Sequence, residues 1–250
     1  MTLPNHIGII PDGNRRWAQQ NGLPKKQGYQ HGLQPGLELF RLCRQLGIKE
    51  LTYYGFTMDN TKRPSEQTAA FRQACVQAVE MLAREDASLL VVGKQDSPLF
   101  PPKLLTYTQR TNFGSGNIKV NFLVNYGWQW DIKNILSNKK ENKKKKSQKI
   151  SRKLQKNSHV TTKTITKNKI QNKTNNPNNK KITEYLHSSD ISRIDLIIRW
   201  GNHRRLSGFL PLQSVYADIF VVSELWPNFK EKHLQKALKW YDKQDPTYGG

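Results

Sequence analysis

The sequence predicts an α/β fold in which helices flank a mostly parallel central sheet. Short apolar runs alternate along the chain with longer segments whose apolar residues recur at helical spacing. Strands that alternate with helices in this way favour a parallel sheet covered on both faces. A length of 250 residues is ample for a buried core. We therefore expect a single domain over residues 1–250.

Six apolar runs are expected to form the strands of this sheet. The first, His6–Ile10, ends at Pro11-Asp12-Gly13-Asn14, which has the composition of a turn. The second, Leu51–Phe56, is rich in β-branched and aromatic residues, which suit a pleated surface. The remaining runs are Leu89–Val92, Ile118–Val124, Asp195–Ile198 and Ile219–Val222.

Three segments show the apolar spacing of amphipathic helices. Leu39, Leu42, Cys43 and Leu46 share one face of a segment from Gly32 to Leu46, which Gly47 closes. A second helix carries Phe71, Cys75, Ala78 and Leu82 on one face, and a final helix uses Phe229, Leu234, Ala237 and Trp240. The two cysteines fall within these apolar faces and have no CxxC spacing, so we expect reduced core thiols.

A lysine- and asparagine-rich segment, Asn138–Lys181, interrupts this pattern. It holds fifteen lysines, one arginine and one glutamate, a local charge of +15 that leaves +7 of the formal +22 for the rest of the chain. Its apolar content is too low to offset the entropy of ordering it, so we expect a disordered low-complexity insertion within the domain. The strong basicity therefore belongs mainly to this segment.

The expected location of the chain is the cytoplasm. The residues before His6 do not resemble a signal peptide, and no apolar run approaches the ~20 residues that span a bilayer. The basic segment could contact an anionic membrane surface or a nucleic-acid backbone electrostatically. It has no interleaved aromatics for base stacking, so specific nucleic-acid recognition is not expected. Compositional drift explains the segment equally well.

Polar residues gather directly after three of the six runs. Ligands of an open parallel sheet bind beyond the carboxyl ends of its strands, so these positions are candidates for a site. The first cluster is Asp12, Asn14, Arg15 and Arg16; the second is Thr57, Asp59, Asn60 and Arg63; the third is Arg199, Arg204, Arg205 and Ser207. Thr57 and Asp59 are taken as substrate-binding candidates on this basis alone.

The residue types in these clusters indicate a site for anionic oxygen ligands. Guanidinium groups match phosphate geometry, and a carboxylate beside them can hold Mg²⁺ that bridges phosphate oxygens. One such cluster is equally well explained by solvated loop charges. Three at equivalent ends of one sheet favour a functional site, and the sequence has no P-loop, GxGxxG, His/Cys metal set or Ser/His/Asp signature to suggest another chemistry.

Five motifs resemble those of the cis-prenyltransferases, the undecaprenyl diphosphate synthase family. They are HIGIIPDGNRRWA, YYGFTMDNTKRP, VNYGWQWDI, DLIIRWGNHRRLSGFLPLQSVYADIF and ELWPNF, in family order. The resemblance covers nearly the whole chain except the basic insertion. It implies a cis-prenyltransferase-like fold and an enzyme that uses Mg²⁺ to condense isopentenyl diphosphate with an allylic diphosphate. The family forms homodimers, so a homodimer is expected.

The resemblance also implies roles for matching positions. Asp12 matches the essential aspartate that positions Mg²⁺ and the diphosphate, and Asn60 matches the catalytic-loop asparagine. Positions expected to hold the allylic diphosphate are Gly13, Asn14, Arg15, Arg16, Trp17, Lys25 and Arg63. Arg199, Arg205 and Ser207 match the site of the second diphosphate. Asp218 stands where the family has a metal-binding glutamate.

Three departures from the family pattern leave the exact reaction open. Arg15 replaces a glycine, Tyr29 replaces a histidine, and His203 replaces a glutamate, the last two at substrate-binding positions. Bacterial lavandulyl-type synthases, which join two dimethylallyl units head-to-middle, resemble this chain at these points. Because Asn60, Arg205 and Ser207 persist, we place regular chain elongation ahead of irregular coupling. A catalytically silent regulatory subunit is a third alternative, which the retained site residues disfavour.

Overall fold

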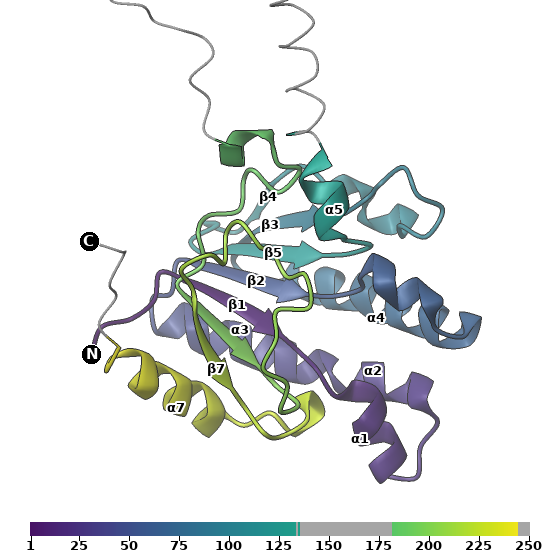
Figure 1. The fold of residues 1–250 in the computed structure, drawn as a ribbon, viewed down its shortest axis with the longest axis horizontal. Coiled ribbons are helices and arrows are strands. Elements are labelled where there is room, and N and C mark those ends of the chain that lie inside the picture. Colours follow the sequence, from purple (N-terminus) through teal and green to yellow (C-terminus); the bar gives the residue numbers. More distant parts are fainter. Residues whose placement is uncertain (134, 136–181, 245–250) are drawn as a thin grey trace, which may run out of the picture. The chain divides into compact units, whose positions relative to one another are not determined.

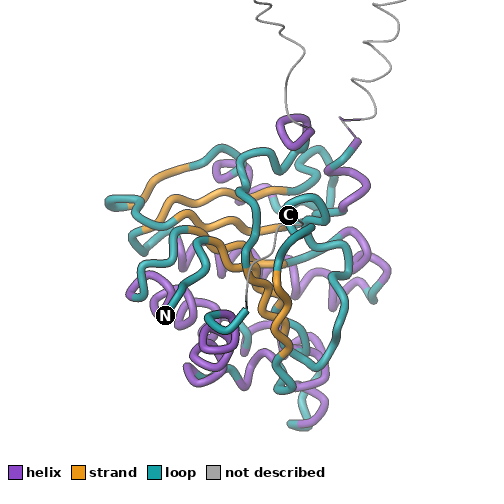
Figure 2. The backbone as a smooth tube through the Cα atoms, turned by 60° about the vertical axis from the view of Figure 1, so that its left-hand side comes forward, coloured by secondary structure: helices purple, strands orange, loops and turns teal. Residues whose placement is uncertain are grey.

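The computed structural model describes residues 1–133, 135 and 182–244, and within them seven strands form one sheet. The strand order is β4-β3-β5-β2-β1-β6-β7. The strands are β1 (His6–Ile10), β2 (Glu50–Tyr54), β3 (Ala87–Val92), β4 (Thr111–Phe113), β5 (Lys119–Leu123), β6 (Leu196–Arg199) and β7 (Asp218–Val221). They lie side by side in one twisted layer (Figure 2). The predicted α/β class is confirmed.

The sheet is parallel except at one edge. β1 pairs in parallel with β2 and β6, and Ile9 lies opposite Tyr53 on one side and Ile198 on the other. The arrows of β1, β2 and β5 point to the same side of the molecule (Figure 1). β4 pairs antiparallel with β3 and is the strand that the sequence did not predict. Its three residues, Thr-Asn-Phe, are too few and too polar to show a strand period.

Among the helices of the described residues, α3, α4 and α7 correspond to the three predicted amphipathic segments. They are α1 (Asn14–Gln20), α2 (Gly28–His31), α3 (Leu33–Gln45), α4 (Ser65–Leu82), α5 (Trp128–Asp131) and α7 (Glu231–Tyr241). α7 begins two residues after Phe229, which the periodicity had placed inside the helix. Phe229 follows a 3₁₀ turn at Trp226–Asn228, and extended backbone at Lys230 separates it from the helix.

Alternate residues of the central strands bury against two separate layers. On β3, Leu89 and Val91 join a core that also includes residues of α3, α4 and α7, whereas Leu90 and Val92 join a second core on the other face. This alternation is the two-residue period of a strand buried on both faces. The second face is covered largely by the segment 190–217 instead of by long helices. Both cysteines are buried in the first core, as predicted.

The chain divides into two compact units. One consists of residues 1–131 and 190–250 and carries the sheet, and the other consists of residues 132–189. The described part of the second unit includes a 3₁₀-helix at Ile182–Tyr185. The basic insertion lies outside the described residues. The expected contact with a membrane surface rests on that insertion, so it stays a prediction. The expectation of a single domain stays a prediction. No helix in the described part of the chain is long and apolar enough to cross a membrane.

Candidate active site

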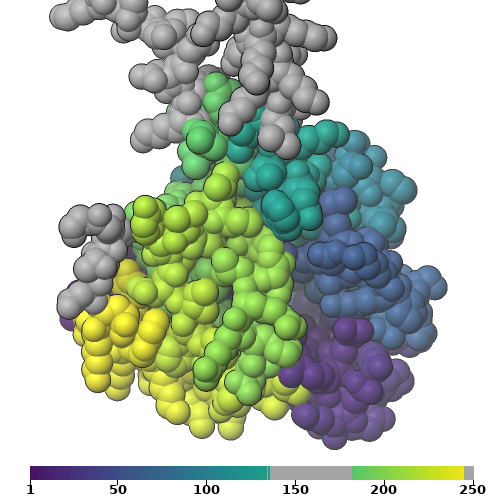
Figure 3. Space-filling view, in the orientation of Figure 1, coloured from purple at the N-terminus to yellow at the C-terminus, as the bar shows by residue number. Residues whose placement is uncertain are grey.

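A cavity of about 670 Å³ lies at the carboxyl ends of β1, β2 and β6. All three polar clusters predicted from the sequence contribute to its walls. Predicted residues that line it are Asp12, Gly13, Asn14, Arg15, Arg16, Lys25, Tyr29, Thr57, Asp59, Asn60, Arg63, Arg199, His203, Arg205 and Ser207. Segments from both ends of the chain therefore meet here, and Figure 3 shows N-terminal and C-terminal atoms side by side on one face.

Asp12 is the residue on which cationic side chains from two segments converge. Arg199 Nη2 donates to Asp12 Oδ2 over 2.9 Å, and Arg16 Nη2 lies 3.5 Å from Asp12 Oδ1. His203 Nε2 lies 3.9 Å from Asp12 Oδ2. The Asp12 side chain is 31% exposed, so the carboxylate faces the cavity while the two arginines hold it. A carboxylate fixed in this way can bind a hard cation or a ligand that enters the cavity.

Arg199 is the buried centre of the third cluster. Its side chain is only 4% exposed, and Nη1 donates to Ser207 Oγ over 3.0 Å and to the Arg205 carbonyl. Ser207 has a φ of 53°, and its own carbonyl accepts a hydrogen bond of 2.7 Å from the Tyr54 hydroxyl. The loop after β6 is thus tied to both β6 and β2. This linkage fixes the loop that carries His203 and Arg205 at the cavity.

Gly13 makes the turn from β1 into α1. Its φ of 113° is a conformation that side chains disfavour, and a Cβ there would lie 2.8 Å from the Leu225 side chain. The turn brings Arg16 within reach of the neighbouring loop, where its Nη2 donates to the Gly201 carbonyl over 2.9 Å. Asn14 Oδ1 is buried without a hydrogen-bond partner among the described residues. A buried acceptor of this kind is uncommon and points to a ligand or water at this wall.

The second cluster is a short capped turn that ends at Arg63. The backbone N–H of Thr57 donates to Asn60 Oδ1 over 3.0 Å, while the Thr57 side chain accepts from the Asn60 backbone. This reciprocal pairing is a capping box, which fixes the loop before α4. Asp59 is largely exposed and pairs with Lys62 over 3.1 Å. Arg63 Nη1 donates to the Tyr29 hydroxyl over 3.1 Å, which connects this loop to α2.

An apolar cleft adjoins the polar cavity. It has a volume of about 60 Å³ and lies among α2, α3, α4 and the strands β2 and β5. Pro11, Asn14, Tyr29, Gly55 and Phe71 line both spaces, so these residues form the boundary between them. The site therefore combines a strongly cationic chamber with an apolar recess. That combination suits a ligand that has an anionic head and a hydrocarbon tail.

The pKa values of two basic residues at the cavity, His203 and Arg63, are lowered. Partial burial lowers the pKa of His203. The negative charge of Asp12 raises this pKa, whereas the positive charges of three nearby arginines lower it further; they are Arg16, Arg205 and Arg199. His203 is therefore neutral at pH 7 in the ligand-free site. Burial also lowers the pKa of Arg63, although its ordinary value is so high that it stays charged. The chamber thus keeps its cationic character through its arginines.

Two predicted site residues lie away from the cavity lining. Trp17 is on the other side of α1 from Arg15, Arg16 and Gln19, because each helical residue is rotated by 100°. Its Nε1 donates to Asn228 Oδ1 over 2.8 Å, so Trp17 fixes α1 against the C-terminal segment. Substrate contact by Trp17 stays a prediction, and the contact that the structure shows supports α1.

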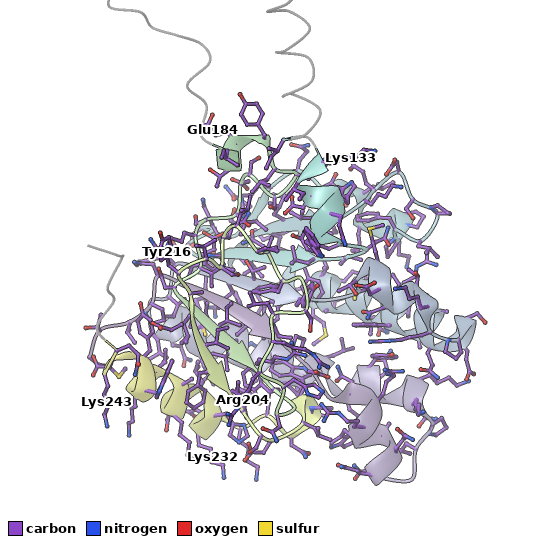
Figure 4. The ribbon with its side chains drawn as sticks, viewed as in Figure 1. Lys133, Glu184, Arg204, Tyr216, Lys232 and Lys243 are labelled. Carbon is purple, nitrogen blue, oxygen red and sulfur yellow. The ribbon has the colours of Figure 1, made fainter. Side chains whose placement is uncertain are left out.

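Asp218, the second expected metal ligand, also lies away from the cavity within one chain. It is the first residue of β7 and pairs with Leu196, whereas the cavity lies at the other end of the strands. Asp218 is level with Ile7 of β1, two strand spacings away, and Asp12 lies five residues beyond Ile7, which puts the two aspartates roughly 15–20 Å apart. Figure 4 shows Tyr216, just before β7, well separated from Arg204 in the loop after β6. Within one chain, Asp218 is therefore not placed to share a metal ion with Asp12.

The structure adds residues that the sequence reasoning missed. Gln19, Tyr54, Phe71 and Trp128 line the cavity without having been proposed as site residues. Tyr54 and Trp128 belong to motifs that carry the family resemblance, so that resemblance contained a signal for them. Phe71 was assigned to a helix face, where nothing in its spacing separates a core residue from a site residue. Its role depends on which elements pack against α4.

Comparison with known proteins agrees with this geometry. The family model for undecaprenyl diphosphate synthase matches residues 10–249. The chain is 27% identical to a ditrans,polycis-undecaprenyl-diphosphate synthase of Vibrio parahaemolyticus, over 99% of this chain and 91% of that protein. It is 28% identical to an isoprenyl transferase of Thermotoga maritima, over 100% of this chain and 98% of that protein.

A solved structure has the same fold. Lavandulyl diphosphate synthase from Lavandula x intermedia, determined in complex with dimethylallyl diphosphate, superposes with a TM-score of 0.72 and 21% identity, covering 99% of each chain. At that identity the likeness establishes the fold alone. The family match, by contrast, extends over almost the entire sequence and includes the three loops that line the cavity. The chain belongs to the undecaprenyl diphosphate synthase family of prenyltransferases.

Proposed function

We propose that the chain condenses isopentenyl diphosphate with an allylic diphosphate, giving a longer prenyl diphosphate with cis double bonds and releasing diphosphate. The observation that carries this proposal is the convergence of three polar loops on Asp12 in a cationic chamber that adjoins an apolar cleft. The names of the bacterial relatives support the same reaction class. The diphosphates would occupy the chamber and the growing hydrocarbon the cleft.

The cationic side chains would favour departure of the leaving group. When an allylic carbon loses diphosphate, negative charge grows on the leaving oxygen, and fixed donors aimed at that oxygen stabilise the transition state. Arg15, Arg16 and Arg63, which line the chamber, would do this for the allylic diphosphate. Arg199 fixes the Arg205–Ser207 loop, which would hold isopentenyl diphosphate. The alkene of isopentenyl diphosphate then forms the new carbon–carbon bond, and a proton leaves the adjacent carbon.

The chemistry around Asp12 fits Mg²⁺ binding with the help of substrate. Among the described residues, no cluster of three or more His, Cys, Asp or Glu side chains has the spacing of a metal site. Mg²⁺ in phosphate-handling enzymes is commonly held by one or two carboxylates together with substrate oxygens and water. Asp12 provides one carboxylate at the chamber wall, and the diphosphate would provide the remaining charge. Bound Mg²⁺ would supply Lewis-acid stabilisation of the diphosphate.

The test is to incubate purified protein and Mg²⁺ with dimethylallyl diphosphate, alone and with isopentenyl diphosphate, and to identify products by mass spectrometry after dephosphorylation. Geranyl and farnesyl diphosphates serve as alternative primers. Products that require isopentenyl diphosphate and grow by five carbons support chain elongation. Absence of product with every combination would instead support the alternative of a silent subunit.

Irregular head-to-middle coupling of two dimethylallyl units is the second candidate. One observation favours it: His203, which replaces a family glutamate, lies beside Asp12 and is neutral in the ligand-free site. Exchange of a carboxylate for a neutral group would alter how a proton leaves near the second diphosphate. A branched ten-carbon product from dimethylallyl diphosphate alone would identify this reaction in the same assay.

We further propose that two copies of the chain associate along the free edge of β7. β7 forms one edge of the sheet, and exposed apolar side chains lie on and before it. They are Leu212, Val215, Tyr216 and Ile219, with Val215 60% exposed. A strand edge beside exposed apolar groups is a surface that a second copy can cover. Sedimentation should give a dimer for the wild type and a monomer for Val215→Lys combined with Ile219→Lys.

A further inference from the structure

The boundary between the chamber and the apolar cleft is formed in part by two stacked aromatic rings. Tyr29 of α2 and Phe71 of α4 line both spaces, and their ring centroids are 4.5 Å apart with planes only 5° from parallel. A hydrocarbon chain that passes from the chamber into the cleft must therefore pass these rings. Their positions set the width of the entrance.

The Tyr29 ring is held from two directions. Phe71 stacks on one face, and Arg63 Nη1 donates to the Tyr29 hydroxyl over 3.1 Å. The Arg63 guanidinium itself lies 5.6 Å from the Phe71 ring centroid, which completes a three-residue cluster. Tyr29 is only 4% exposed. A buried ring with a satisfied hydroxyl and a stacked partner has little freedom to turn aside.

The cleft behind this entrance is small. Its volume is about 60 Å³, against about 670 Å³ for the chamber, so the space behind the rings is narrow compared with the space in front of them. We expect a cleft this narrow to accept a short hydrocarbon tail, and a longer chain must push lining side chains aside.

From this geometry we infer that Tyr29 is a specificity-determining residue, which restricts the length of the allylic tail. The inference rests on the proposed function, because it assigns the cleft to the hydrocarbon tail of that substrate. Stacking on Phe71 keeps the Tyr29 ring in its restricting position, and the hydrogen bond from Arg63 to the hydroxyl adds a smaller contribution. Phe71 supports the ring from α4. The chain thus selects short allylic diphosphates over long ones at the entrance to its own cleft.

The chain provides variants that act on the entrance in opposite directions. Tyr29→Ala removes the ring and joins the chamber to the cleft, whereas Tyr29→Phe keeps the ring and removes only the hydroxyl that accepts from Arg63. Gly36→Leu narrows the cleft instead. A Cβ on Gly36 would lie 3.9 Å from Trp226 and 4.0 Å from Tyr53, which is ordinary contact, so the added side chain can enter without a backbone clash.

The experiment measures binding of unreactive thio analogues of dimethylallyl, geranyl and farnesyl diphosphates to the full-length chain by calorimetry. Inorganic diphosphate is the reference for the head group. The wild type is expected to gain no affinity from the second and third isoprene units. Tyr29→Ala should improve the farnesyl-to-dimethylallyl affinity ratio by about tenfold or more, within the range that pocket shape controls. Tyr29→Phe should change this ratio little.

Gly36→Leu keeps the inference testable if Tyr29→Ala fails to fold. It should weaken all prenyl analogues relative to inorganic diphosphate, with little change in the diphosphate itself. An unchanged farnesyl-to-dimethylallyl ratio in folded Tyr29→Ala, or strong preference of the wild type for the farnesyl analogue, would overturn the inference. Failure of the proposed reaction is a separate result. It would show as absence of products in the turnover assay while the binding ratios still follow the pattern above.

Discussion

Arg199 joins β6 to β1 through its guanidinium, whose Nη2 donates to Asp12 Oδ2 over 2.9 Å. The two residues are 187 positions apart in the sequence, yet β1 and β6 are adjacent parallel strands. The same guanidinium also reaches Ser207. One buried side chain therefore sets both the orientation of the proposed metal-binding carboxylate and the position of the loop proposed to hold the second diphosphate.

The separation of Asp12 from Asp218 predicts different effects for two matched substitutions. Asp12→Asn should lower kcat by roughly a hundred- to a thousandfold, because it removes a charge placed where the leaving group and Mg²⁺ would meet. Asp218→Asn should change kcat by less than about twofold, because within one chain the half-buried Asp218 lies at the end of the strands away from the cavity. The measurement is prenyl transfer across a Mg²⁺ titration. A comparable loss in both variants would contradict the placement of Asp218.

Replacement of Arg199 by lysine should damage the site despite the retained charge. Lysine is a point charge and cannot supply the forked donors that reach Asp12, Ser207 and the Arg205 carbonyl together. We expect a loss of about 1–3 kcal/mol in unfolding free energy and a fall in kcat/KM. Denaturant unfolding and steady-state kinetics measure the two. The exposed Arg204→Lys is the control, and equal effects at both positions would show that the fork is unimportant.

The positive φ of Gly13 predicts a position that tolerates no side chain. Gly13→Ala should be destabilised by about 1–2 kcal/mol for the backbone alone, with a further loss from contact with Leu225. Gly22→Ala is a matched control, because Gly22 has a φ of 70° but no atom within 4 Å of an added Cβ. Thermal unfolding should separate the two variants, and only Gly13→Ala should also lose activity. Equal losses of stability would indicate that the Leu225 contact relaxes.

The buried His6 predicts a loss of stability in acid. Burial lowers the pKa of His6, and Glu50 opposes this. Because the folded pKa lies below the unfolded value of about 6.5, the unfolded state binds the proton first. The contribution is thus present above pH ~6.5 and lost as the pH falls below it. Denaturant unfolding from pH 8 to pH 5 should show a weaker pH slope in His6→Gln, and an identical slope would refute the assignment.

Most of the sheet and its three site loops could be predicted from the sequence. β1 and β6 are short apolar runs followed at once by Asp12 and by arginines, so both the strand and the end that carries chemistry were visible locally. β4 was missed because its three polar residues are stabilised by pairing with β3. The metal-binding role expected for Asp218 stays a prediction, because a motif gives a residue's order in the chain and not the end of the strand at which it lies.

The fold class, the strand ends that carry arginines and the residue types suited to anionic ligands could be predicted from the amino-acid order, because these features depend on local periodicity and residue chemistry. The folded structure was needed to show that Arg199 holds Asp12, that Trp17 turns away from the cavity, and that Tyr29 stacks on Phe71. These relationships join residues on different elements. They depend on strand order and helix packing, which bring distant side chains within a few ångströms and which no local pattern encodes.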